Sequence, residues 1–161
     1  MTLKVASLAE IKKELNQLNE KELIDLVLEL SKFSRDNKAY LFFKLSEKDN
    51  PNLYVEMVQE ELELEFQKAN VKNYHYAKKA AQSIRRKMNK SLKLSKDKTA
   101  QIEIIAYFCR QLKSHGFLKH RHPVIQNLYE IQIRKIEKLI GGLHEDLQYD
   151  YQQLLEELNE G

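Results

Sequence analysis

Residues that interrupt a helix are scarce in this sequence, which has four glycines and two prolines among 161 residues. Between them, Leu, Ile and Val recur at intervals of three and four, the spacing that places side chains on one face of an α-helix. No stretch alternates apolar and polar residues between turn signals, as a half-exposed strand would. The sequence therefore predicts an all-α protein, a compact bundle or a short stack of helical hairpins with seven to eight helices.

Capping signals suggest where these helices begin. Ser7 with Glu10 has the spacing of a capping box, and Asn50 followed by Pro51 is typical of a cap and a first helical position. Ser95 is expected to cap the sixth helix, which would end at Gly116. The other helices are expected at about residues 7–18, 19–30, 34–45, 51–69 and 74–92, with a seventh from Pro123 and an eighth after Gly141-Gly142, unless those two glycines only kink one long helix.

The length suits one domain over residues 1–161, and 42% hydrophobic with 32% charged residues is a balance typical of soluble globular proteins. The longest apolar run, Ile104–Cys109, is far shorter than the ~20 residues that a membrane-spanning helix needs. The first residues lack the apolar core of a secretion signal, and Cys109 is the single cysteine. We therefore expect a cytoplasmic protein without disulfides, in which Cys109 is buried and unreactive.

Positive charge is concentrated between residues 72 and 98, where ten Lys or Arg accompany one acid, Asp97, in a chain whose net charge is only +3. On a helical wheel for residues 74–92, small and apolar side chains take one side and cations the other. The candidate partner-binding residues are Lys78, Lys79, Arg85, Arg86, Lys90 and Lys93.

Three interpretations of this basic helix stay open. Its cations are solvated or paired with the protein's own acidic helices, or they bind an acidic protein surface, including that of a second copy, or they bind RNA or DNA together with Tyr74. Nucleic-acid binding is the less favoured functional interpretation, because two long acidic segments would repel phosphate. The sequence thus predicts a non-enzymatic interaction module, with nucleic-acid binding as the alternative.

No arrangement of residues indicates a catalytic, metal or cofactor site. His115, His120 and His122 lie close together in the sequence, but no carboxylate accompanies them, and a Glu-x-x-His pair for a di-iron bundle is absent. Four scattered glycines cannot form a nucleophile elbow or a phosphate-cradling loop. We therefore nominate no catalytic residue, metal ligand, cofactor or small-molecule substrate, and we expect that the protein is not an enzyme.

Residues 18–30, LNEKELIDLVLEL, followed by DNKAYL at 36–41, resemble the start of a group of small, all-helical bacterial proteins of uncharacterised function. In that group, a short helix leads into a Lys-Glu-Leu-Ile type helix and then a third helix after a polar turn. The likeness covers about the first third of the chain. It implies a helical fold and a bacterial source, and it brings no functional residues.

Overall fold

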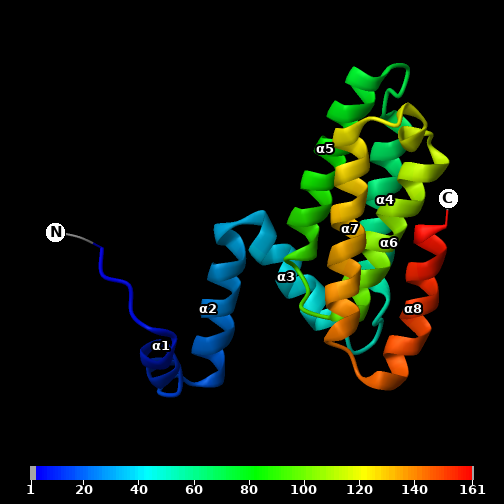
Figure 1. Cartoon of the computed structure of the whole chain (residues 1–161). Coiled ribbons are helices and arrows are strands. Elements are labelled where there is room, and N and C mark those ends of the chain that lie inside the picture. The colour runs from blue at the N-terminus through cyan, green and yellow to red at the C-terminus, as the bar shows by residue number, and fades with distance from the viewer. Residues whose placement is uncertain (1–2, 161) are drawn as a thin grey trace. The chain divides into compact units, whose positions relative to one another are not determined.

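The computed structural model describes residues 3–160, and within them it contains helices and turns but no strand. The all-α prediction is therefore confirmed. The described chain forms eight α-helices and one 3-10 helix, η1 (Figure 1). Their bounds are α1 Leu8–Leu15, α2 Glu20–Phe33, α3 Arg35–Ser46, α4 Leu53–Lys68, α5 Tyr74–Leu92, α6 Lys98–Ser114, η1 Phe117–His120, α7 Pro123–Gly141 and α8 Glu145–Asn159.

The chain divides into an N-terminal unit, residues 1–44, and a C-terminal unit, residues 45–161. Helix α3 begins in the first unit and ends just inside the second. The single domain expected over residues 1–161 stays a prediction.

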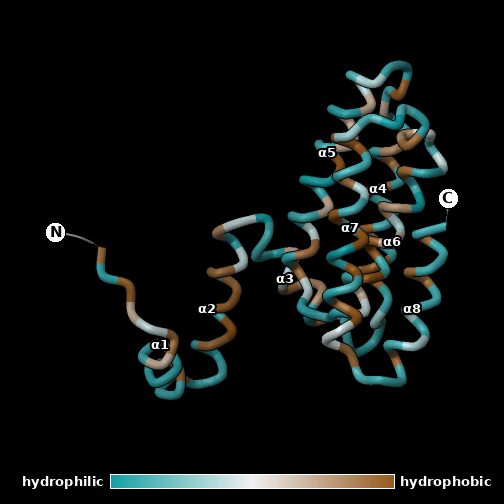
Figure 2. The backbone as a smooth tube through the Cα atoms, viewed as in Figure 1, coloured by the Kyte–Doolittle hydropathy of each residue, from teal (hydrophilic) through white to brown (hydrophobic). Residues whose placement is uncertain are grey.

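In the N-terminal unit, side-chain caps fix the starts of the helices. Ser7 and Glu10 form the expected capping box of α1, and Asn19 accepts a hydrogen bond from the Glu22 amide at the start of α2. Helices α1, α2 and α3 contain no buried residue, although much of α2 is hydrophobic (Figure 2). An apolar groove of about 360 Å³ lies between α1 and α2. Helices α1 and α2 are thus amphipathic without enclosing a core.

The C-terminal unit is a bundle of α4 to α8 built around α6. Helix α6 packs against α4, α5, α7 and α8, and eight of its seventeen residues are buried, from Ala100 to Leu112. The central position of α6 agrees with its sequence, in which apolar residues occupy most sides of the helix and few polar side chains need contact with water. Figure 2 shows the hydrophobic residues of the bundle gathered between its helices.

Phe66 of α4 contacts aromatic rings of α6 and η1 at one end of the core. Its ring lies 5.7 Å from those of Phe108 and Phe117 and 5.4 Å from the imidazole of His115, which it stacks upon. Gly116, at φ of 80°, turns the chain from α6 into η1 so that Phe117 enters this cluster. Glycine adopts this left-handed conformation without a steric cost, because it lacks a side chain. Gly116 therefore ends α6, as the sequence predicted.

Two predicted helix starts are wrong. Helix α4 begins at Leu53, after a turn that holds Pro51, so Asn50 is not its cap. Asp97 rather than Ser95 caps α6 and accepts from the Thr99 amide, because Ser95 binds the Asp97 amide and shapes the preceding turn. The open question at Gly141-Gly142 is answered, since α7 ends at Gly141 and α8 begins at Glu145.

Candidate functional site

Helix α5 has the two sides that the sequence predicted. Asn73 caps its start by accepting from the Tyr76 amide. The side that faces the bundle buries Ala77, Ala81, Ile84 and Met88. The two alanines are small, so α5 can approach its neighbours closely. The helix contains six Lys or Arg and no acid. Its outer surface is therefore positive over its whole length.

We use the term basic face for the six candidate residues. Lys79, Arg86, Lys90 and Lys93 are exposed, whereas Lys78 and Arg85 are half-buried at the edge of the helix. The Lys78 ammonium lies 5.6 Å from the centre of the Tyr74 ring, within the range of a cation–π interaction. The structure thus places five of the six on α5 and the sixth, Lys93, at its C-cap, and four of the six side chains are exposed.

The basic face is not neutralised by the protein's own acids. In the described part of the chain, the ion pair on α5 is formed by Lys87, whose ammonium lies 2.7 Å from the Glu65 carboxylate of α4. None of the six residues of the basic face makes an ion pair within residues 3–160. Internal pairing with acidic helices therefore does not account for them.

Arg85 differs from the other cations of the basic face because it is drawn toward α7. Its Nε is buried and has no hydrogen-bond partner in the described structure. Lys135 of α7 is also half-buried, and its Nζ donates to Oδ1 of Asn89 on α5 at 3.3 Å. Burial lowers the pKa of Lys135, and the nearby Arg85 lowers it further. The charges of Arg85 and Lys135 are therefore close enough to interact.

The contact between Lys135 and Asn89 could not be predicted from the sequence, because a helical wheel of α5 alone shows nothing of α7.

Gln132, also on α7, was not predicted as a site residue either, although its position in the sequence is unusual. It interrupts the buried apolar stripe that includes Leu128, Ile133 and Ile136, and its side chain is fully buried. Neither its amide nitrogen nor its amide oxygen has a hydrogen-bond partner. A polar residue in a core stripe is uncommon and calls for an explanation.

The aromatic residue proposed to aid nucleic-acid binding is already engaged. The Tyr74 ring stacks on the His122 imidazole, with centroids 3.4 Å apart and planes at 20°. One of its faces is therefore covered, which leaves less of the ring for stacking on a base. Tyr76, 48% exposed, is the more accessible aromatic ring at this end of α5.

The three clustered histidines have separate structural roles. His115 stacks on Phe66, and a ring nitrogen of His120 lies 3.3 Å from the Val71 carbonyl oxygen. His122 Nδ1 accepts from the Val124 amide at the start of α7. Among residues 3–160, no group of three or more His, Cys, Asp or Glu side chains is arranged to hold a metal ion.

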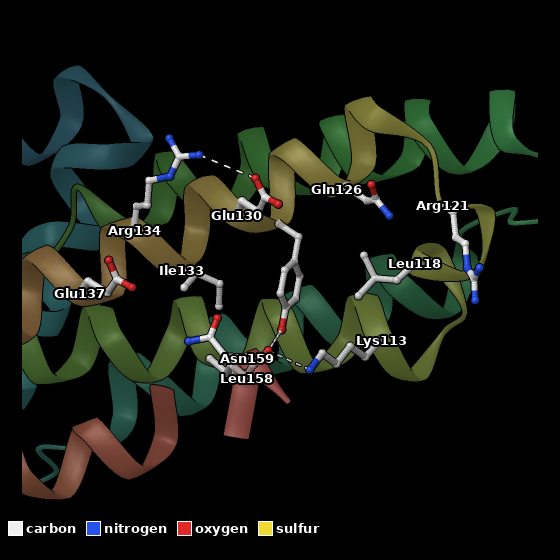
Figure 3. A pocket seen from close by; sticks show the side chains of 11 residues that line it. Lys113, Leu118, Arg121, Gln126, Glu130, Ile133, Arg134, Glu137, Leu158 and Asn159 are labelled. Atoms are coloured by element: carbon white, nitrogen blue, oxygen red, sulfur yellow. Dashed lines mark hydrogen bonds and ion pairs between the residues drawn. The ribbon is translucent and has the colours of Figure 1, made fainter. Parts of the chain in front are cut away.

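A second surface feature is an open groove of about 730 Å³ along α7, between α6 and the end of α8 (Figure 3). Lys113 points into it and donates to the carbonyl oxygens of Leu158 and Glu160 at 2.9 Å. Tyr129 donates to the same Leu158 oxygen at 2.6 Å. These groups bind the free carbonyls at the C-terminus of α8, so their hydrogen-bonding capacity serves the fold.

Cys109 lies in the middle of the bundle, as predicted. Its side chain is fully buried, and burial raises the pKa of the thiol to about 12. The nearby Lys113 and Arg110 oppose this shift without cancelling it. Because the thiolate is the reactive form, Cys109 is unsuited to nucleophilic chemistry at neutral pH.

In residues 3–160, no helix has the length and apolar character that crossing a bilayer requires. The comparisons with known proteins give no relative: no protein-family model matches the chain, and no curated protein or solved structure is significantly similar to it.

Proposed function

We propose that this protein is a non-enzymatic interaction module that binds an acidic protein surface through the basic face of α5. The observation that carries the proposal is that Lys79, Arg86, Lys90 and Lys93 project into solvent with no acidic partner in the described chain. A one-sided row of unpaired charges raises the rate and selectivity of docking to a surface of opposite charge.

A second copy of the chain is one possible source of that acidic surface. Helix α8 contains five acids and no Lys or Arg, the reverse of α5. Two reciprocal contacts between α5 and α8 would give a closed two-fold dimer, whereas one such contact per pair would give rings or filaments. Self-association is therefore a version of the proposal that can be tested by itself.

The proposal keeps a cytoplasmic, bacterial setting, which follows from the single cysteine and from the resemblance of the first third of the chain. Binding of RNA or DNA by the basic face is the alternative. The stacking of Tyr74 on His122 weighs against it, since it reduces the aromatic surface beside the cations.

The test uses poly-glutamate as the acidic probe and a mixed-sequence single-stranded oligonucleotide as the competing one. We expect the protein to bind poly-glutamate at low salt, and we expect the double variant Arg86→Glu/Lys90→Glu to lose this binding. Because surface charges are screened by salt, the affinity of the wild type should fall steeply as salt is added. Fluorescence anisotropy measures both affinities at matched ionic strength.

The matched control is Lys12→Glu/Lys13→Glu, which makes the same change of charge on exposed residues of α1. Equal losses in both double variants would show a net-charge effect and contradict the proposal. Tighter binding of the oligonucleotide than of poly-glutamate would favour the nucleic-acid alternative. Sedimentation over a concentration series tests self-association, and a monomer at high concentration would eliminate that version.

A further inference from the structure

Helices α5 and α7 lie side by side and run parallel (Figure 1). Near their N-termini, Tyr74 stacks on His122. Further along both helices, Lys135 donates to Asn89. We call the region between these two contacts the seam. Half-buried residues of both helices line it.

Two cations meet in this seam without a counter-charge. Arg85 and Lys135 are both half-buried, and their mutual repulsion is stronger there than in open solvent, because the protein interior screens charge less well than water. Such an arrangement destabilises the fold unless an anion offsets it.

Acids on the elements packed against the seam have partners or positions elsewhere, and on α6 Glu103 accepts from the Tyr151 hydroxyl of α8. Helix α5 has none. On α7, Glu130 and Glu137 line the groove of Figure 3, and Glu130 lies 3.7 Å from Arg134 there. On α4, Glu65 pairs with Lys87.

Polar groups without partners occur at the same level of the seam. The hydrogen bond between Lys135 and Asn89 joins residues 46 positions apart in the sequence. Because α5 and α7 are parallel, the same difference in number places Gln132 of α7 at the height of Arg86 of α5, one residue from Arg85. Gln132 precedes Lys135 by three residues, so the two share one side of α7. Arg85 Nε and both polar atoms of the Gln132 amide are buried and unsatisfied. Native proteins seldom leave such groups unpaired, and a bound ion is a usual explanation.

We propose that Arg85, Lys135 and the neighbouring Gln132 amide form a binding site for a single phosphate-type oxyanion in the seam between α5 and α7. Phosphate oxygens accept several hydrogen bonds at once, which suits a guanidinium, an ammonium and an amide on two neighbouring helices. The site shares Arg85 with the basic face, but it does not rest on the proposed function, because Lys135 and Gln132 lie outside that face.

The test is the thermal unfolding midpoint of the full chain in millimolar inorganic phosphate, compared with sodium chloride at equal ionic strength. A ligand that binds only the folded state raises this midpoint. We expect phosphate to raise it for the wild type and for Lys135→Arg, which keeps the charge. In Arg85→Gln and Lys135→Gln we expect the apparent affinity to fall about tenfold or more, since each loses a charged hydrogen-bond donor.

Lys138→Gln is the matched control, because Lys138 is an exposed lysine on the same helix and its loss changes the net charge equally. It should keep the phosphate response. Circular dichroism checks that each variant is folded. An unchanged phosphate response in Lys135→Gln, or an equal response of the wild type to chloride, would overturn the proposal. A parallel titration with glycerol 3-phosphate distinguishes a phosphorylated molecule from the free ion as the source.

Gln132→Leu gives a second, independent test. Replacing a buried unsatisfied amide with an apolar side chain of similar size removes a desolvation cost. In phosphate-free buffer we therefore expect this variant to unfold at a higher temperature than the wild type. In phosphate we expect its response to be smaller. A variant that is more stable and also keeps the full phosphate response would exclude Gln132 from the site.

Discussion

Both units contain amphipathic helices, such as α2 and α7, but the two units differ in what they bury. Phe66, in α4, is 1% exposed among aromatic neighbours, whereas Phe33, at the end of α2, is 82% exposed. Helices α1 to α3 bury no side chain, while α4 to α8 enclose a continuous core. An apolar stripe thus shows which side of a helix avoids water, but burial also requires enough neighbouring helices to cover that side.

Size explains the difference. A unit of 44 residues has too much surface for its volume to enclose a core of its own, whereas the C-terminal unit packs four helices around α6. We therefore expect the stability of the protein to reside in the C-terminal unit.

The first prediction compares the two phenylalanines. Phe66→Ala should lower the free energy of unfolding by about 3–5 kcal/mol, because it removes a buried ring and leaves a cavity beside Phe108 and Phe117. Phe33→Ala should change it by less than about 0.5 kcal/mol, as for an exposed site. Urea unfolding followed by circular dichroism measures both. Equal losses would mean that the N-terminal unit contributes to stability as strongly as the core does.

The second prediction concerns alkaline pH. Burial raises the pKa of Tyr54 and of Tyr129 above the usual value of 10.0, and both hydroxyls donate to backbone carbonyls. Since the unfolded phenols ionise first, their stabilising contribution is complete below pH 10 and is lost as the pH rises above it. The free energy of unfolding should therefore fall above pH 10.

Tyr129→Phe sharpens this prediction, because it removes one of the two buried phenols. We expect it to lower the stability by about 1 kcal/mol at neutral pH and to make the alkaline decline shallower. Tyr40→Phe, on α3 of the N-terminal unit, is the control and should leave the profile unchanged. A pH profile that is as steep in Tyr129→Phe as in the wild type would contradict the assignment.

The third prediction compares one cap from each unit. Asp97→Ala removes the cap of α6 and should lower the free energy of unfolding by about 1 kcal/mol. Ser7→Ala removes the capping box of α1 and should reduce helicity locally while the thermal midpoint stays the same. Circular dichroism and backbone amide exchange measure these effects. A lower midpoint in Ser7→Ala would show that α1 unfolds together with the core.

Much of the local structure could be predicted from the sequence. The bounds of α5, Tyr74–Leu92, and the start of α7 at Pro123 agree with expectation, because spacing and caps act over a few residues. The errors at Pro51 and Ser95 arose where two polar residues compete for one cap. The 3-10 helix at Phe117–His120 was missed, because it depends on the burial of Phe117 in an aromatic cluster that unites distant segments.

The candidate sites follow the same division. The sequence by itself determined that α5 has a cationic side and an apolar side, since both follow from residue order within one helix. Only the tertiary structure decided which cations lack acidic partners, which side chains are buried, and that Lys135 of α7 binds Asn89 of α5. Ion pairing, desolvation and the register of two helices depend on residues far apart in the chain, and these become neighbours only when the helices pack.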